Sequence, residues 1–164
     1  MMTIEITKYF KTHNKDVVNL ILNIQQNEFG IPIDIDSQPD LLSIPGFYQR
    51  GNGNFWVATI DNIVVGTIAL LDIENNNVAL RKMFVKSEFR GSPFGVGQAL
   101  LNTVFAWKAE RKLNSIFLGT TEKFLTAQRF YEKNGFKEID KELLPKEFPV
   151  MSVDVKFYKY IVND

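Results

Sequence analysis

The sequence lacks cysteine altogether and contains a single histidine among its 164 residues. Without cysteine the chain has no disulfide bond, no thiolate metal site and no cysteine nucleophile. An excess of either charge is missing as well, because nineteen basic residues balance nineteen acidic ones. A balanced chain has no long-range attraction for nucleic acid. The composition therefore predicts neither a metal cofactor nor a nucleic-acid partner, and His13 is interpreted as a surface or capping residue.

A long apolar stretch and a secretory signal are also missing. The longest apolar run, residues 63–71, is too short to cross a bilayer as a helix. Residues 1–5 lack the basic and apolar regions of a signal peptide. A length of 164 residues suits one domain with a sizeable core. We therefore expect a single domain over residues 1–164, located in the cytoplasm and without a membrane partner.

The most informative segment is residues 83–101, where an apolar strand leads through a glycine-rich turn into an amphipathic helix. The first turn of a helix has backbone N–H groups without intrahelical partners, and the helix dipole places partial positive charge there. Glycines at positions 91, 95 and 97 let an anion approach those amides, and Arg90 adds a cation. The segment therefore predicts a site for a phosphate-bearing cofactor.

Two common phosphate-binding loops do not fit this segment. A Walker loop requires lysine after its last glycine, where this chain has Gln98. A dinucleotide fingerprint requires glycine or alanine at the position of Leu100, and it follows an opening strand rather than one in mid-chain. The segment instead resembles motif A of the GNAT superfamily of N-acetyltransferases. That motif reads Arg/Gln-x-x-Gly-x-Gly/Ala after a strand that ends in valine, here Val85.

A second segment, residues 127–136, resembles motif B of the same superfamily, Ala-x-x-Phe/Leu-Tyr-x-x-x-Gly-Phe. Apolar residues recur at helical spacing up to Tyr131, and Asn134-Gly135 is typical of a helix C-terminus with glycine in the left-handed conformation. An expected strand at 115–119 lies between the two motifs. Their order and separation extend the resemblance over nearly the whole chain.

The order of expected elements predicts an α+β fold with a mixed sheet. The resemblance implies the acyl-CoA N-acyltransferase arrangement, a central and mostly antiparallel sheet with splayed parallel strands, flanked by helices. Asn14 is expected to cap the first helix, at 15–28, and residues 41–49 are expected to form a short helix or turn. Strands are expected at 3–10, 55–60, 63–72, 78–85, 115–119, from 136 onward, and at 151–160.

The resemblance also implies the chemistry. Acetyl-coenzyme A would bind where strands 78–85 and 115–119 splay apart, and a main-chain N–H there would polarise the thioester carbonyl. Tyr131 would protonate the departing thiolate. The implied function is N-acetyl transfer to a primary amine of a small molecule or peptide, without a metal. The implied cofactor-binding residues are Met83, Phe84, Val85, Arg90, Gly91, Phe94, Gly95, Val96, Gly97 and Gln98.

Several positions depart from the family pattern. Ser92 occupies the Arg/Gln position, so the loop is two residues longer, and Pro93 has no N–H to offer. Phe124 stands where many relatives carry an asparagine that touches the cofactor. Ala79 stands where many relatives carry a glutamate that acts as the base. A water chain can deprotonate the amine instead, and the acidic residues in the neighbourhood are Glu74, Glu122 and Asp154.

The acceptor is expected to bind between the irregular segments 30–49 and 144–151, because loops on a rigid scaffold carry specificity. Arg81 and Lys82 are interpreted as solvated charges on the cofactor strand. Two other functions stay open: a degenerate coenzyme A-binding sensor or structural module, and a nucleotide- or phosphate-binding protein. Homodimerisation is also left open. The residues expected to contact the acceptor are Phe29, Asp36, Tyr48 and Phe148.

Overall fold

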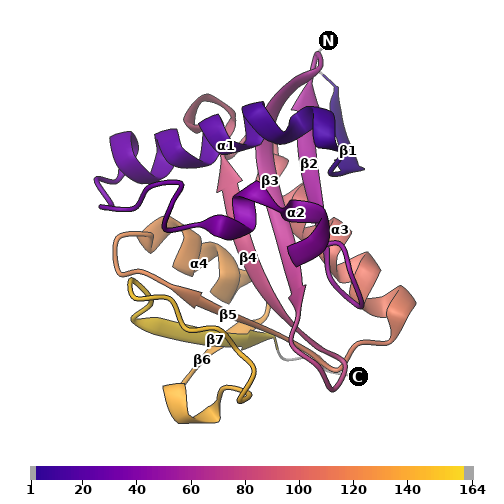
Figure 1. Ribbon diagram of the computed structural model, residues 1–164, viewed down its shortest axis with the longest axis vertical. Coiled ribbons are helices and arrows are strands. Elements are labelled where there is room, and N and C mark those ends of the chain that lie inside the picture. The colour runs from indigo at the N-terminus through magenta and orange to yellow at the C-terminus, as the bar shows by residue number, and fades with distance from the viewer. Residues whose placement is uncertain (1–2, 161–164) are drawn as a thin grey trace.

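The computed structural model describes residues 3–160, which form a seven-stranded mixed sheet with helices on both faces (Figure 1). The strands lie in the order β1-β2-β3-β4-β5-β7-β6. The β4–β5 pair is parallel and the other neighbouring pairs are antiparallel, which confirms the predicted α+β mixed sheet. The strands are β1 (Ile4–Lys8), β2 (Asn54–Ile60), β3 (Ile63–Asp72), β4 (Asn77–Val85), β5 (Ser115–Thr120), β6 (Phe136–Ile139) and β7 (Lys156–Tyr160).

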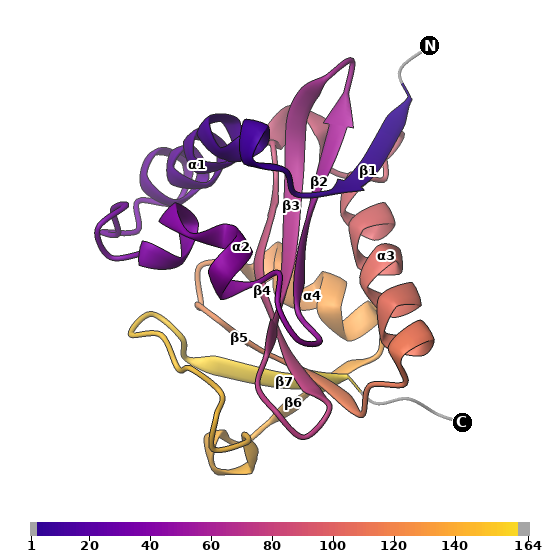
Figure 2. The same ribbon diagram turned by 45° about the vertical axis from the view of Figure 1, so that its right-hand side comes forward.

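Helices α1 and α2 cover one face of the sheet, and α3 and α4 cover the other (Figure 2). Each face has its own apolar cluster, with Val17, Ile21 and Leu41 on the first and Leu100 and Val104 on the second. The sheet thus separates two layers of helices. The helices are α1 (Asn14–Leu22), continued by a π-helical segment Asn23–Glu28, then α2 (Ile44–Phe47), α3 (Val96–Arg111) and α4 (Leu125–Lys133).

The central strands are apolar on both faces because both faces are covered. In β2, Phe55 and Val57 belong to the α1–α2 cluster, whereas Trp56 and Ala58 belong to the α3–α4 cluster. The longest apolar run of the sequence forms most of β3, a strand buried along almost its whole length. Such continuous apolar strands are typical of a sheet with helices on both faces. Within residues 3–160, no helix is both long and apolar enough to cross a membrane.

The parallel strands β4 and β5 pair over a short distance and then separate. Asn77 pairs with Ser115, Val78 with Ile116 and Ala79 with Phe117. Beyond Ala79, β4 continues to Val85, with no further β5 partner in the described part of the chain. The main-chain groups on this side of β4 therefore lack ladder partners and can bind a ligand, apart from the Val85 carbonyl, which accepts a hydrogen bond from Arg90.

A β-bulge in β4 accompanies this separation. The register between β3 and β4 shifts between Thr67 and Ala69, and Lys82 adopts a positive φ of 52°. The Thr67 hydroxyl donates a hydrogen bond of 2.7 Å to the Lys82 carbonyl, which holds the bulge in place. Bulges re-aim side chains and are frequent beside active sites. The bulge thus gives Lys82 an orientation that regular alternation along β4 does not predict.

Several boundaries differ from those expected, and specific hydrogen bonds explain two of the differences. Asn14 is the first residue of α1 rather than its cap, because its side-chain amide donates to the Leu41 carbonyl at 3.1 Å. Strand β7 begins at Lys156 rather than at residue 151, because Asp154 N–H bonds the Met151 carbonyl and closes a turn before the strand. At Asn14 a contact with a distant segment decides the local conformation, and before β7 a local turn decides it.

Candidate active site

A cavity of about 120 Å³ lies where β4 and β5 separate. Its wall combines the bulged part of β4, the end of β5, Tyr131 of α4 and the segment before β7. Among the residues that line the cavity are Arg81, Lys82, Tyr131, Phe148, Met151 and Asp154.

The loop from β4 to α3 presents a helix N-terminus beside this cavity. Gly95 is the N-cap of α3 with a φ of 65°, and Gly91 also has a positive φ, 68°. The Gly95 N–H bonds the Gly91 carbonyl at 3.0 Å, which closes the loop tightly before the helix. The amides of residues 96–98 follow in the first helical turn, where intrahelical acceptors are missing. This is the geometry that binds phosphate groups.

Gly97 packs the first turn of α3 against the cleft. A Cβ at this position would lie 3.5 Å from Met83 Cε and 3.8 Å from both Val85 and the Phe130 ring. These are ordinary contact distances, so the fold itself has room for a small side chain at position 97. The end of β4, the start of α3 and the middle of α4 therefore meet at Gly97.

Arg90 in this loop and Gln98 in the first turn of α3 already have partners within the protein. The Gln98 amide donates to Asn102 and to Asn134, both at 2.9 Å, and so ties α3 to the end of α4. Arg90 is held by Glu28, to which its Nη2 donates at 2.7 Å while Nη1 bonds the second carboxylate oxygen. Arg90 Nε also donates to the Val85 carbonyl at 2.8 Å. Arg90 thus links the π-helical segment to the end of β4.

Tyr131 lies on α4 and lines the cavity with 5% of its surface exposed. Its ring packs against Phe130 and Phe136. Burial raises the pKa of Tyr131, because the phenolate would lose its hydration. The hydroxyl therefore keeps its proton at neutral pH and can donate it. Gly135 after α4 has a φ of 95°, which confirms the left-handed glycine expected at this helix end.

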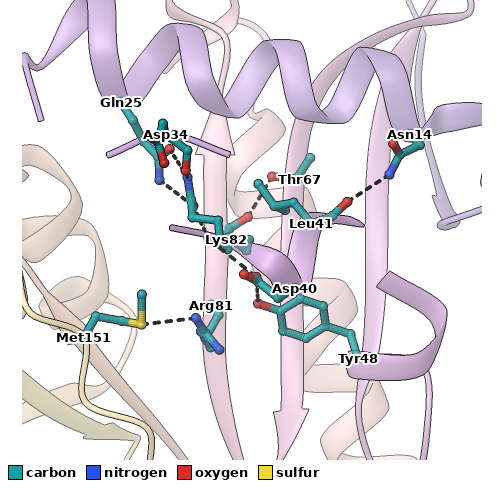
Figure 3. A network of polar contacts seen from close by, with 11 residues as sticks. Asn14, Gln25, Asp34, Asp40, Leu41, Tyr48, Thr67, Arg81, Lys82 and Met151 are labelled. Carbon is teal, nitrogen blue, oxygen red and sulfur yellow. Dashed lines mark hydrogen bonds and ion pairs between the residues drawn. The ribbon is translucent and has the colours of Figure 1, made fainter. Parts of the chain in front are cut away.

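A buried ionic network lies on the opposite side of the cleft, under α1 and α2 (Figure 3). Lys82 Nζ is 3.5 Å from Asp40 Oδ2, and the two side chains are 7% and 5% exposed. Lys82 also donates to Gln38, whose amide exchanges hydrogen bonds with Gln25. Tyr48 donates its hydroxyl to Asp40 at 2.6 Å. Burial lowers the pKa of Lys82 to about 8, against the attraction of Asp40, which raises it.

Arg81 and Lys82 are therefore not solvated charges, and that interpretation of the sequence was wrong. Both side chains line the cavity, and Lys82 is almost fully buried. A signal existed in the sequence, because two adjacent cations interrupt an otherwise apolar strand. Burying a charge costs free energy unless a partner compensates it, so such a pair in a central strand indicates a polar site.

The residues expected to contact the acceptor fall into two groups. Phe148 lines the cavity, and Phe29 packs edge to face on Phe124 of the cavity wall with ring centres 4.8 Å apart. Tyr48 does not line the cavity, because it is fully buried beside Asp40. Asp36 lies exposed on the loop before α2 and does not reach the cavity either.

Of the acidic residues considered as bases, Asp154 alone lines the cavity, while Glu74 and Glu122 are exposed. Asp154 accepts a hydrogen bond of 3.0 Å from the Met151 N–H, and burial raises its pKa. A Cβ on Gly119 of β5 would lie 2.7 Å from Asp154 Oδ2, so glycine makes room for this carboxylate. Residues 3–160 contain no group of acidic or histidine side chains arranged to hold a metal.

Comparisons with known proteins point in one direction. The acetyltransferase (GNAT) domain family matches residues 51–138. The N-acetylaspartate synthetase of Danio rerio is 34% identical over 109 residues, which are 65% of this chain and 38% of that protein. The corresponding protein of Xenopus tropicalis is 37% identical over 61% of this chain. The chain spans less than two fifths of the length of these curated relatives.

Solved structures match over nearly the whole chain. An acetyltransferase of the GNAT family from Staphylococcus aureus Mu50 superposes with a TM-score of 0.92 at 42% identity, covering 96% of this chain and 98% of that one. An acetyltransferase from Streptococcus agalactiae gives the same TM-score at 32% identity, covering 97% and 98%. The PaiA N-acetyltransferase of Thermoplasma acidophilum, solved in complex with coenzyme A, shares the fold at 18% identity, with a TM-score of 0.74 over 96% of this chain and 98% of that one.

Proposed function

The chain belongs to the acetyltransferase (GNAT) family, and we propose that it transfers an acetyl group from acetyl-coenzyme A to a primary amine. The observation that carries the proposal is the cleft between β4 and β5, which has a free helix N-terminus on one side and Tyr131 in its wall. The similarity to proteins named as N-acetyltransferases supports an amine as the acceptor.

The main chain of this cleft suits the acetyl donor. We assign the pyrophosphate to the amides of residues 96–98, and the pantetheine arm to the unpaired edge of β4 near Met83, Phe84 and Val85. The glycines at 91 and 95 shape the loop, while Phe94 packs on Phe89 beneath it with ring centres 5.1 Å apart. Arg90 fixes the loop by binding Glu28. When the cofactor binds, Arg90 also acts as a nearby cation for its phosphates.

The side chains of the cavity suit the chemistry. The amine nitrogen attacks the thioester carbonyl carbon, and a main-chain N–H of β4 stabilises the oxyanion that forms. Asp154 takes the proton that the amine must lose. The C–S bond then breaks, its electron pair leaves with sulfur, and the Tyr131 hydroxyl protonates the thiolate. Asp154 then releases the amine's proton to solvent and solvent returns a proton to Tyr131, so that acetylated amine and coenzyme A are the products.

The melting temperature with and without acetyl-coenzyme A tests the first half of this proposal. A ligand that binds only the folded state adds about 2.7 kcal/mol of stability at a hundredfold excess over its dissociation constant. Adenine nucleotides without pantetheine serve as the control and are expected to stabilise less. Equal stabilisation by ATP would favour a nucleotide-binding protein instead.

Thiol release from acetyl-coenzyme A, measured over a panel of amines, tests the second half. Release that depends on the amine is expected. Stabilisation by coenzyme A with no release for any amine class would favour the sensor or structural module. The cytoplasmic location and the absence of a nucleic-acid partner stay predictions from composition.

A further inference from the structure

The cation Arg81 has an unusual environment in the cavity. Its guanidinium donates to Met151 Sδ at 3.4 Å and lies over the rings of Phe47 and Tyr48, 5.6 and 5.8 Å from their centres. Figure 3 shows the side chain pointing toward Met151, away from the Lys82–Asp40 pair. Within residues 3–160, no carboxylate lies within ion-pairing distance of Arg81.

The neighbouring cations are compensated, which makes the contrast informative. Lys82 faces Asp40, and Arg90 faces Glu28. A thioether and two aromatic faces satisfy Arg81 only in part, because its planar fork of N–H donors matches the two oxygens of a carboxylate. A partly buried guanidinium that lines a cavity without such a partner is a built anion site.

Asp154 supplies the opposite charge in the same cavity. It lines the wall from the segment before β7, and the hydrogen bond that the structure gives its side chain comes from the Met151 N–H. Asp154 is not within ion-pairing distance of Arg81; burial raises the pKa of Asp154, and the nearby charge of Arg81 opposes that rise. Met151 contacts both residues and stands between them. The cavity therefore holds a cation and an anion that are separated rather than paired.

We propose that the acceptor amine carries a carboxylate, so that it binds as a zwitterion of the amino-acid type, with its carboxylate on Arg81 and its ammonium group facing Asp154. This inference rests on the proposed acetyl transfer and names the substrate class for the same site. The cavity of about 120 Å³, with Phe148 and Pro149 as apolar walls, suits a small acceptor. A polyamine would bring a second cation toward Arg81 and Lys82, which disfavours it.

Matched pairs of acids and amides test the proposal, because amidation removes the carboxylate charge and keeps the amine. The pairs are alanine and alaninamide, and β-alanine and β-alaninamide, with putrescine as a cationic amine. Thiol release gives kcat/KM for each, and the melting temperature of the coenzyme A-loaded protein gives binding independently of turnover. For the better acid, we expect kcat/KM to exceed that of its amide by about tenfold to a hundredfold, which is the range for hydrogen bonds to charged groups.

Two variants assign the preference to Arg81. Arg81→Gln is expected to remove the preference by raising KM for the acid while KM for the amide stays unchanged. Arg81→Lys keeps the charge without the planar guanidinium and is expected to keep part of the preference for the acid. This variant also tests the inference if Arg81→Gln folds poorly. Arg50→Gln is the control, because it removes the same charge from an exposed position outside the cavity.

The outcomes separate the inference from the function on which it rests. No melting shift with acetyl-coenzyme A would overturn both. If acetyl-coenzyme A shifts the melting temperature but the amides or putrescine are acetylated as efficiently as the acids, the carboxylate inference alone is overturned. If no amine of the panel reacts, the melting temperature of the coenzyme A-loaded protein decides. Equal shifts of that temperature by an acid and its amide would also overturn the carboxylate inference. A preference for the acid that survives in Arg81→Gln would also contradict it.

Discussion

The two sides of the cleft are built from different kinds of groups. On the α3–α4 side, the groups assigned to the pyrophosphate of the acetyl donor are main-chain amides of consecutive residues, 96–98, at the start of α3. On the α1–α2 side, the polar groups are side chains from separate segments: Gln38 and Asp40 before α2, Lys82 on β4 and Asp154 before β7. The first arrangement depends on local backbone conformation, and the second depends on which segments fold together.

The difference extends to the energetics of the charges. The Lys82–Asp40 pair is 7% and 5% exposed, whereas the Arg90–Glu28 pair is 35% and 31% exposed. Removing one partner of a buried pair leaves an uncompensated charge, but water replaces the partner of an exposed one. Changes on the α1–α2 side should therefore alter folding stability, and changes on the α3–α4 side should mainly alter ligand binding.

The largest expected effect concerns the chemistry at Tyr131. Tyr131→Phe keeps the ring in its apolar contacts and removes the proton donor, so turnover is expected to fall by about 10²–10⁴-fold. Acetyl-coenzyme A affinity should hold, since the hydroxyl does not bind the phosphates. Single-turnover kinetics with a good amine measure the chemical step. Unchanged turnover would leave Tyr131 as a packing residue.

The next effect concerns stability on the α1–α2 side. Asp40→Asn leaves the buried Lys82 ammonium without its carboxylate, and we expect a loss of about 3–5 kcal/mol in the free energy of unfolding. Asp36→Asn is the matched control, because Asp36 is exposed on the same loop. Its change should stay within about 0.5 kcal/mol. Urea denaturation measures both, and equal effects would contradict the comparison.

The depressed pKa of Lys82 predicts a pH dependence of stability. This lysine has a pKa of about 8 in the folded protein and an ordinary value of 10.5. Between these values the unfolded chain binds more protons than the folded one, so stability rises with pH. The full rise is about 3 kcal/mol. Urea denaturation from pH 7 to 10.5 measures this rise in the free energy of unfolding. The rise should occur in the wild type and in Lys137→Met, an exposed control, and it should be absent in Lys82→Met.

A smaller effect is expected for Gly97 on the α3–α4 side. The fold has room at this position, but a branched side chain would occupy the space beside the first amides of α3. Gly97→Val should therefore lose most of the about 2.7 kcal/mol that acetyl-coenzyme A adds at a hundredfold excess. Ala106→Val, on an exposed position of the same helix, introduces the same side chain and should keep that gain. Thermal melting with and without ligand compares them.

The smallest effect concerns the exposed pair between Arg90 and Glu28. Arg90→Gln and Glu28→Gln are each expected to cost under about 1 kcal/mol of unfolding free energy, because water screens the pair. Acetyl-coenzyme A binding, measured by calorimetry, should weaken in Arg90→Gln and not in Glu28→Gln. Equal weakening in both would assign Arg90 a purely structural role in holding the loop.

Much of the fold could be predicted from local patterns. Strand β3 occupies the expected residues 63–72, and the helix of motif B ends at the expected glycine. One error occurred where a distant contact decides the outcome, because Asn14 bonds Leu41 instead of capping α1. No local pattern encodes that contact, because its two partners lie far apart in the chain. The other error is local, because the turn between Met151 and Asp154 delays the start of β7.

The same limit applies to the site. The glycine-rich loop and Tyr131 lie in two short motifs, and the structure places both beside one cleft. Of the residues expected at the acceptor, Phe148 lies in the wall, whereas Tyr48 and Asp36 do not. Arg81 and Lys82 were misread, since their burial depends on the bulge in β4 and on segments before α2.

By itself the sequence determined the order of strands and helices and the glycine-rich loop at the start of α3. These properties follow from periodicity, from glycine and from helix ends, which act over a few residues. The family was indicated by the resemblance of two short motifs. The tertiary structure alone decided that Lys82 meets Asp40, that Asp154 fits beside Gly119, and that Arg81 lines the cavity without a carboxylate partner in residues 3–160. The charged lining of the cavity results from chain segments that only folding brings together, so the adjacent cations in the sequence of β4 indicate a polar site without indicating which groups face them.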